Sequence, residues 1–457
     1  MKKLLICYLM TLGLATHANA TDLMDIYQQA LENDTVFKNA YDTYMASTEA
    51  IPQARAALLP QVTVASQVSR NLLHLNDGLF TVQDEHYAAT QWQATASQAI
   101  FNYKYWAQVR QAKASVKAAQ ATFNDAAQDL MLRTAKAYFD VLYAQDTLNF
   151  AEAKKRANKR QYDQAEQRFQ VGLDAITSVY EAKAAFDQST ATVISARNNK
   201  INQSENLRKL TNHVYEVLAP LRDSKIPLIK PEPNNVDEWV DTGLKQNYKL
   251  FAAKYTLEVA RDNVKALSAG NWPTLAFQAT TNQIHNEVGH SSNPLLPANQ
   301  KQSSVALALN FPVFQGGLVR SQTRQAQHQF QASSEKTEQA YRDVVVNSRI
   351  AFNTITDGIS KVKADRQTII SQRNSLESTE AQFEVGTRTM VDVVNSQQRL
   401  FEAQQQLAND QYILINSVLT LKYLAGTLNA NDIELINSWL ATTRVNGFPT
   451  VAGKAGK

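Results

Sequence analysis

The chain has 457 residues, with 46 lysines and arginines, 42 aspartates and glutamates and a single cysteine. This near balance of charge gives no electrostatic reason to expect a nucleic-acid partner. The lone Cys7 excludes an internal disulfide and a site built from several thiolates. Beyond residue 20 no stretch approaches the roughly 20 apolar residues of a membrane-spanning helix, so none is predicted.

Residues 1–20 have the pattern of a secretory signal. Two lysines precede a mostly apolar run over residues 4–15, and Ala18-Asn19-Ala20 provides small residues suited to cleavage. Cleavage after Ala20 would leave a mature chain without cysteine, with 44 basic and 42 acidic side chains and hence a charge of +2. An uncleaved anchor is the alternative, but the apolar run is short for one. We therefore predict export.

Alternating side chains predict a pair of strands in the first half of the chain. In residues 61–71 and 90–101 apolar residues such as Val62, Val64, Val68, Trp92 and Ile100 lie on one face and polar residues lie mostly on the other. Each run is about 10 residues long, which is the length a tilted strand needs to cross a bilayer. Two amphipathic hairpins on a soluble domain are the alternative.

A very long helix should follow these strands. The segment from Asn102 to Arg168 contains neither proline nor glycine, and apolar residues recur in it every seven positions. At 1.5 Å per residue such a helix would be about 100 Å long. Because so long a helix cannot bury one compact core, we expect a coiled-coil hairpin array or the wall of a cylinder.

The second half repeats the plan of the first. Three landmarks recur with separations of 213, 213 and 214 residues, in the pairs Pro60 and Pro273, Phe101 and Phe314, and Gly172 and Gly386. A duplication explains them. The predicted division is a first repeat over 21–218, a proline-rich linker over 219–236, a second repeat over 237–426 with strands at 273–283 and 302–311, and a C-terminal tail over 427–457.

The predicted fold class is α+β, with long helical hairpins and four strands. Four strands cannot close a barrel, and an open sheet edge is not tolerated in hydrocarbon. Strands from several copies of the chain must therefore combine. Three copies would supply twelve strands, although the residues alone do not choose three over four.

The mature chain resembles the TolC-type outer-membrane efflux protein family over nearly all of its length. The resemblance is carried by ordered, duplicated motifs: Leu59-Pro60-Gln61, Phe101, Tyr138-Phe139-Asp140-Val141-Leu142, Arg168-Phe169-x-Val171-Gly172-Leu173, Phe311-Pro312-Val313-Phe314-Gln315-Gly316-Gly317, Val385-Gly386-Thr387-Arg388-Thr389 and Val391-Asp392-Val393. It implies a homotrimer with a twelve-stranded outer-membrane barrel continued by a helical tunnel in the periplasm.

The resemblance also implies a function and partners. Such a channel-tunnel is the exit duct of tripartite efflux pumps, of type I secretion systems, or of both. Its partners would be a periplasmic adaptor (a membrane fusion protein), an inner-membrane transporter of RND or ABC type, and outer-membrane lipid. No cofactor is implied.

Two turns should then form the periplasmic tip and hold the adaptor. By resemblance, the docking residues are Val171, Gly172 and Leu173 at the first turn and Val385, Gly386 and Thr387 at the second. Glycine lets the chain reverse between helices and leaves backbone open to a partner. The alternative is that these are turn glycines and nothing more.

The periplasmic gate is predicted beside the second turn. Asp392 would form a ring of three carboxylates, which favours cations, and Arg388 would lie one helical turn away. The family's usual second acid, first-repeat acid and tyrosine are replaced here by Asn395, Ser178 and Phe383, which predicts a less charged and more weakly held gate. Gln167 and Thr177 could still supply neutral hydrogen bonds. Asp392 could also be a first-turn carboxylate favoured by the helix dipole.

Other classes of protein explain less of the sequence. A periplasmic coiled-coil adaptor or scaffold would share the hairpins but gives no reason for two bilayer-length strand pairs. Neither a glycine-rich phosphate loop nor a supported catalytic triad is found, so an enzyme is not predicted. The histidines near the strand ends are His74, His86, His285 and His290, and we interpret them as polar loop residues rather than as metal ligands.

Overall fold

The computed structural model describes residues 20–73, 85–222, 226–287 and 298–441. The predicted signal, parts of the loops between paired strands and the last sixteen residues lie outside these ranges. The chain divides into two compact units. The first contains residues up to 39, 125–247 and from 344 onwards, and the second contains 40–124 and 248–343.

The two halves of the chain form the same elements in the same order. In the first half β1 (Gln61–Leu73), β2 (Glu85–Phe101), α4 (Tyr103–Gln170) and α5 (Ile176–Thr211) follow one another. In the second half β3 (Thr274–Glu287), β4 (Asn299–Asn310), α8 (Leu318–Glu384) and α9 (Met390–Leu424) do so. Helices α4 and α8 have 68 and 67 residues. The predicted duplication and the long helix are confirmed.

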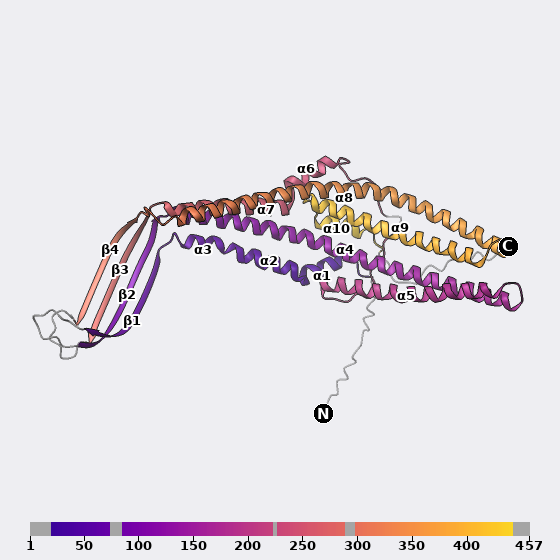
Figure 1. Ribbon diagram of the computed structural model, residues 1–457, viewed down its shortest axis with the longest axis horizontal. Helices are drawn as coiled ribbons and strands as arrows, with labels where there is room; N and C mark the ends of the chain where they lie inside the picture. Colours follow the sequence, from indigo (N-terminus) through magenta and orange to yellow (C-terminus); the bar gives the residue numbers. More distant parts are fainter. Residues whose placement is uncertain (1–19, 74–84, 223–225, 288–297, 442–457) are drawn as a thin grey trace, which may run out of the picture. The chain divides into compact units, whose positions relative to one another are not determined.

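The four strands form one antiparallel sheet in the order β1-β2-β3-β4 (Figure 1). The strands have 13, 17, 14 and 12 residues, which is longer than the alternating runs in the sequence indicate. Pairing extends past those runs because the ladder is made by backbone groups, which any side chain allows. Strands β2 and β3 join the two halves, and β1 and β4 form the edges of the described sheet.

The register of the sheet separates its two faces. Val62, Ala96, Ala279 and Val305 lie opposite one another in one row across all four strands. The next row, on the other face, is Thr63, Thr95, Thr280 and Ser304. Directly opposed residues share a face, and successive residues alternate between faces. One face is therefore apolar and the other polar, and the apolar side chains of β1 and β4 are exposed, with Val64 73% and Val305 73% accessible.

Shorter helices complete the two units. They are α1 (Leu23–Asn33), α2 (Thr35–Thr48), α3 (Ala50–Ala56), α6 (Val236–Gln246), α7 (Tyr248–Ser268), the 3-10 turn η2 (Ala269–Asn271) and α10 (Ala430–Asn437). In the second unit Tyr44 stacks on Phe123 with ring centres 5.6 Å apart, and Tyr103 stacks on Trp272 at 4.7 Å. No helix within the described ranges is both long and apolar enough to cross a membrane.

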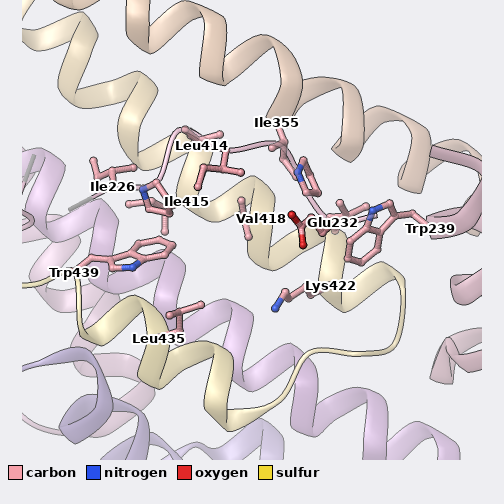
Figure 2. A pocket seen from close by; sticks show the side chains of 14 residues that line it. Ile226, Glu232, Trp239, Ile355, Leu414, Ile415, Val418, Lys422, Leu435 and Trp439 are labelled. Carbon is pink, nitrogen blue, oxygen red and sulfur yellow. The ribbon is translucent and has the colours of Figure 1, made fainter. Parts of the chain in front are cut away.

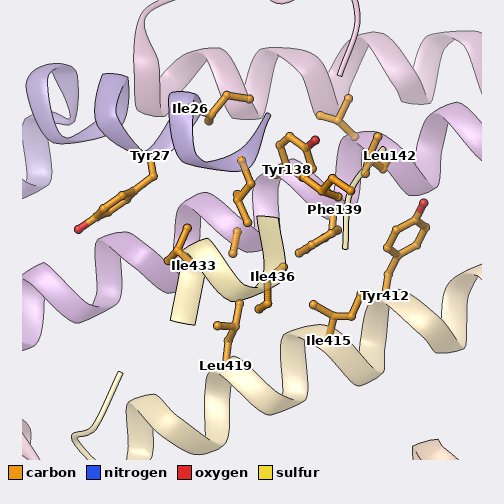
Figure 3. Packing of buried hydrophobic residues seen from close by; sticks show 14 of the residues in the cluster. Ile26, Tyr27, Tyr138, Phe139, Leu142, Tyr412, Ile415, Leu419, Ile433 and Ile436 are labelled. Carbon is orange, nitrogen blue, oxygen red and sulfur yellow. The ribbon is translucent and has the colours of Figure 1, made fainter. Parts of the chain in front are cut away.

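The main apolar core of the first unit gathers side chains from α1, α4, α9 and α10 (Figure 3). Tyr138 and Phe139 of α4 are fully buried there, and Ile433 and Ile436 of α10 pack beside them. The segment after Gly426, which the sequence indicated only as a tail, thus contains a helix that belongs to the core. Asn429 and Asp432 cap α10 reciprocally. Such a capping pair in the sequence indicates the start of a helix, but the repeat pattern ends before it and the helix was not predicted.

Candidate functional site at the helix turns

The turns α4–α5 and α8–α9 have the same backbone geometry. Gly172 and Gly386 both adopt left-handed φ values, +76° and +79°. At the first turn the amide of Leu173 donates to the carbonyl of Arg168 at 2.8 Å, and that of Gly172 donates to Phe169. At the second turn Thr387 donates to Gln382 at 2.9 Å, and Gly386 donates to Phe383. These are two Schellman motifs, which end a helix and reverse the chain.

Both turns present apolar side chains to their surroundings. Val171 is 71% exposed, Leu173 67% and Val385 74%, and Thr387 is exposed as well. A Cβ atom built on either glycine would meet nothing within 4 Å. Each turn therefore carries exposed apolar groups beside an uncovered stretch of backbone, as a docking surface requires. The six predicted docking residues all lie at these two turns.

Behind the turns, the two hairpins pack against each other. Ala165, Val179 and Ala182 of the first hairpin form an apolar cluster with Phe383, Met390 and Val393 of the second. Next to it the Gln161 amide donates to Gln397 Oε1 at 2.7 Å, in a buried position. We call these residues the tip cluster; it lies between the α4–α5 and α8–α9 hairpins, near the turns.

Arg168 adds a charged contact to the tip cluster. Its Nε donates to Asp174 Oδ2 at 2.8 Å, and its guanidinium carbon lies 5.1 Å from the centre of the Phe383 ring. Sequence reasoning assigned no role to Arg168 or Asp174. The sequence shows that Arg168 and Asp174 lie on either side of the turn, but it does not show that Arg168 contacts Phe383, more than 200 residues away.

Asp392 caps the helix that begins after the second turn. Its Oδ2 accepts hydrogen bonds from the backbone amide of Thr389 at 3.0 Å and from the Thr389 hydroxyl at 2.9 Å. The amide of Asp392 points back to that hydroxyl, which completes a capping box. The hydrogen bond from the Thr389 backbone is the main cause that lowers the pKa of Asp392 below 3.8. The carboxylate is therefore charged at neutral pH and half-exposed.

Arg388 contacts residues of its own hairpin. It lies before the start of α9, 3.8 Å from Asp392, and its Nε donates to Gln382 Oε1 at 3.2 Å. Within one chain both of these partners belong to the α8–α9 hairpin. Phe383, which replaces the tyrosine usual in the family, is buried in the tip cluster.

The other predicted gate residues lie close to the turns. Gln167, Thr177 and Asn395 have exposed side chains, and Ser178 is half-buried. Within the described residues, none of these four side chains makes a hydrogen bond. The structure thus brings Phe383, Arg168 and Asp174 together and leaves these four on the surface of a single chain.

A separate cavity of about 300 Å³ lies where the connector after α5 passes over α9 (Figure 2). Trp239 and Trp439 line it from opposite ends, and Leu414 and Val418 of α9 form its floor. Lys422 at its margin is ion-paired with Asp432. None of the predicted site residues lines this cavity, so we assign it to packing of the connector.

The histidines of the strand pairs form no metal centre in the part of the chain that the structure describes. His285 lies within hydrogen-bonding distance, 2.7 Å, of Asn299 on the paired strand. His74 and His290 fall outside the described residues. Over the residues that are described, no group of three histidine, cysteine, aspartate or glutamate side chains is suited to hold a metal ion.

Comparison with known proteins identifies related channels. Residues 26–213 and 239–427 match the family model described as outer membrane efflux protein, once in each half. The chain is 35% identical over 450 residues to outer membrane protein TolC of Escherichia coli, covering 96% of this chain and 90% of that protein. It is 27% identical to the alkaline protease secretion protein AprF of Pseudomonas aeruginosa, covering 92% of this chain and 87% of AprF.

Solved structures share the fold. The CmeC outer membrane channel of Campylobacter jejuni superposes with a TM-score of 0.76 at 17% identity, covering 92% of this chain and 90% of CmeC. VceC of Vibrio cholerae gives a TM-score of 0.74 at 17% identity, covering 88% and 96%. The predicted fold class, long helical hairpins with a small four-stranded sheet, is confirmed.

Proposed function

The chain belongs to the outer membrane efflux protein family, and we propose that it works as a homotrimeric exit duct of tripartite efflux or type I secretion assemblies. The family is one of outer-membrane channels and not of enzymes. The observation that carries the proposal for this chain is its open sheet, which has one apolar face, one polar face and two unpaired edges.

The sheet argues for assembly of several copies in the membrane. In hydrocarbon each unpaired backbone group on an edge strand costs several kcal/mol, so β1 and β4 need partners. Pairing β4 of one copy with β1 of the next would close the sheet, and three copies would give twelve strands. The rows that contain Val62 and Val305 would then face lipid, and the threonine rows would line an aqueous lumen.

The turns argue for a second kind of partner. Exposed Val171, Leu173 and Val385 beside uncovered glycine backbone suit the close approach of helices from a periplasmic adaptor. An inner-membrane transporter of RND or ABC type would complete the assembly. The match to the family model described as outer membrane efflux protein and the similarity to the alkaline protease secretion protein AprF support both kinds of cargo.

Asp392 is our proposed cation-selective element of the entrance. Threefold symmetry would place three such carboxylates around one axis, where they attract cations. The capping box holds each carboxylate at the start of α9 and keeps it ionised. Capping and selectivity are compatible, because accepting hydrogen bonds from Thr389 leaves the negative charge in place.

Planar-bilayer recording of the purified protein tests the proposal. We expect discrete cation-selective conductance steps from a species whose mass in detergent is that of a trimer. A mature chain that stays monomeric without detergent and conducts no ions would instead favour the periplasmic adaptor or scaffold.

A further inference from the structure

We propose that Arg168 is the latch residue of the closed entrance, because it joins the first hairpin to the second through the Phe383 ring. The inference rests on the proposed channel function and deepens it. Asp174 Oδ2 accepts a hydrogen bond from Arg168 Nε at 2.8 Å, and the guanidinium carbon lies 5.1 Å from the centre of the Phe383 ring.

The position of Arg168 makes it sensitive to hairpin movement. Arg168 and Asp174 belong to the first hairpin, and Phe383 lies near the end of the second hairpin's long helix. If the hairpins separate to widen the entrance, the ion pair with Asp174 moves with Arg168 and stays intact. The contact with Phe383 must break, so it favours the closed state alone.

The surroundings make the contact stronger than a surface pair. Phe383 is only 7% exposed, and the side chains of Arg168 and Asp174 are 26% and 14% exposed. Attraction between a cation and an aromatic ring increases when water is excluded. Arginine also stacks flat on a ring while its edge bonds a carboxylate, which lysine cannot do.

Glu384, the last residue of α8, also attracts Arg168 electrostatically. Among the described residues, no other salt bridge or cation–ring contact links the two hairpins at the turns. Arg388, the basic residue beside the second turn, contacts Gln382 and Asp392 of its own hairpin. The polar link from Gln161 to Gln397 is neutral and lies farther from the turns. Phe383 in place of the family's tyrosine therefore does not leave the entrance without a latch.

The chain offers a matched control for the latch. Lys159 pairs with Asp163, and its Nζ lies 5.7 Å from the centre of the Phe186 ring. All three residues belong to the first hairpin. The Lys159 Nζ also lies 5.1 Å from the ring centre of Tyr162, another residue of the first hairpin. Lys159→Gln therefore removes a cation, an ion pair and ring contacts within the first hairpin, and it leaves the contact between Arg168 and Phe383 in place.

Single-channel recording in planar bilayers tests the latch. We expect Arg168→Gln to raise the open probability roughly two- to fivefold per protomer, and more if three protomers open together. Arg168→Lys should give a smaller rise, and Lys159→Gln should match the wild type. Phe383→Leu, which keeps an apolar side chain, should raise opening as Arg168→Gln does, and the double variant should add little.

The results separate the possible failures. A wild-type protein that conducts no ions would refute the proposed channel function. A conducting wild type with Arg168→Gln equal to Lys159→Gln, or with additive effects of Arg168→Gln and Phe383→Leu, would refute the latch. If Arg168→Gln does not assemble, Asp174→Asn decides: it should raise opening modestly, and an unchanged open probability would overturn the proposal.

Discussion

Thr389 and Asp392 cap α9 reciprocally, so one carboxylate both starts a helix and supplies the charge proposed for the entrance. The two roles can be separated by substitution, because the cap needs an acceptor oxygen and selectivity needs a negative charge.

Asp392→Asn should therefore reduce cation selectivity and block by divalent cations, with a smaller loss of stability than Asp392→Ala. The amide oxygen of asparagine can still accept from Thr389, but the charge is gone. Asp392→Ala should lose both properties, with about 1 kcal/mol less stability from the missing cap. Reversal potentials and thermal melting measure the two effects. Unaltered selectivity in both variants would place the constriction elsewhere.

Bulky substitutions at the turns should abolish adaptor docking without preventing assembly. Gly386→Arg and Gly386→Ala both strain a left-handed backbone position, by about 1–2 kcal/mol, but only arginine fills the open space beside the turn. We expect adaptor cross-linking to be lost in Gly386→Arg and largely kept in Gly386→Ala, with trimers in both. Normal cross-linking of Gly386→Arg and of Gly172→Arg would count against docking at these turns.

Removal of a buried hydroxyl in the core should destabilise the first unit. Tyr412 donates a hydrogen bond to Asp146 at 2.6 Å and is only 7% exposed. Tyr412→Phe leaves this carboxylate without its partner, which should lower the free energy of unfolding by about 1–3 kcal/mol. Tyr180→Phe, at a side chain that is 65% exposed, is the control. Equal melting temperatures for the two variants would contradict the argument.

A carboxyl pair between α8 and α9 should make stability depend on pH. Burial and the neighbouring Asp410 raise the pKa of Asp365 to about 6, while Lys361 pairs with Asp410 at 3.0 Å and Gln406 donates to it. The folded state therefore holds the Asp365 proton more tightly than the unfolded chain does. Its stabilising contribution is full below about pH 4 and is lost as pH rises through about 6.

Asp365→Asn removes this loss, because the amide needs no proton to lie beside a carboxylate. We expect the variant to melt a few degrees above the wild type at pH 8 and close to it at pH 4. Asp357→Asn, on the same helix, is the control variant. If the difference in melting temperature between the wild type and Asp365→Asn does not change with pH, the proposed raised pKa of Asp365 is wrong.

Much of the fold could be read from the sequence because its determinants are local or periodic. The absence of proline and glycine from 102–168 predicts α4, the alternation of apolar and polar residues predicts the faces of the strands, and near-constant offsets such as that between Gly172 and Gly386 reveal the duplication. The same glycines mark the turns, since a left-handed residue at a helix end is a requirement of the backbone itself.

The contacts between distant segments were decided only by the tertiary structure. No periodicity predicts that Ile433 and Ile436 enter the core beside Phe139, or that the ring of Phe383 meets Arg168. Such contacts depend on how two hairpins of nearly equal length align against each other, and that alignment is set by packing over the whole interface. The sequence by itself thus determined the elements, their repetition and the turns, whereas packing decided which side chains at those turns act together.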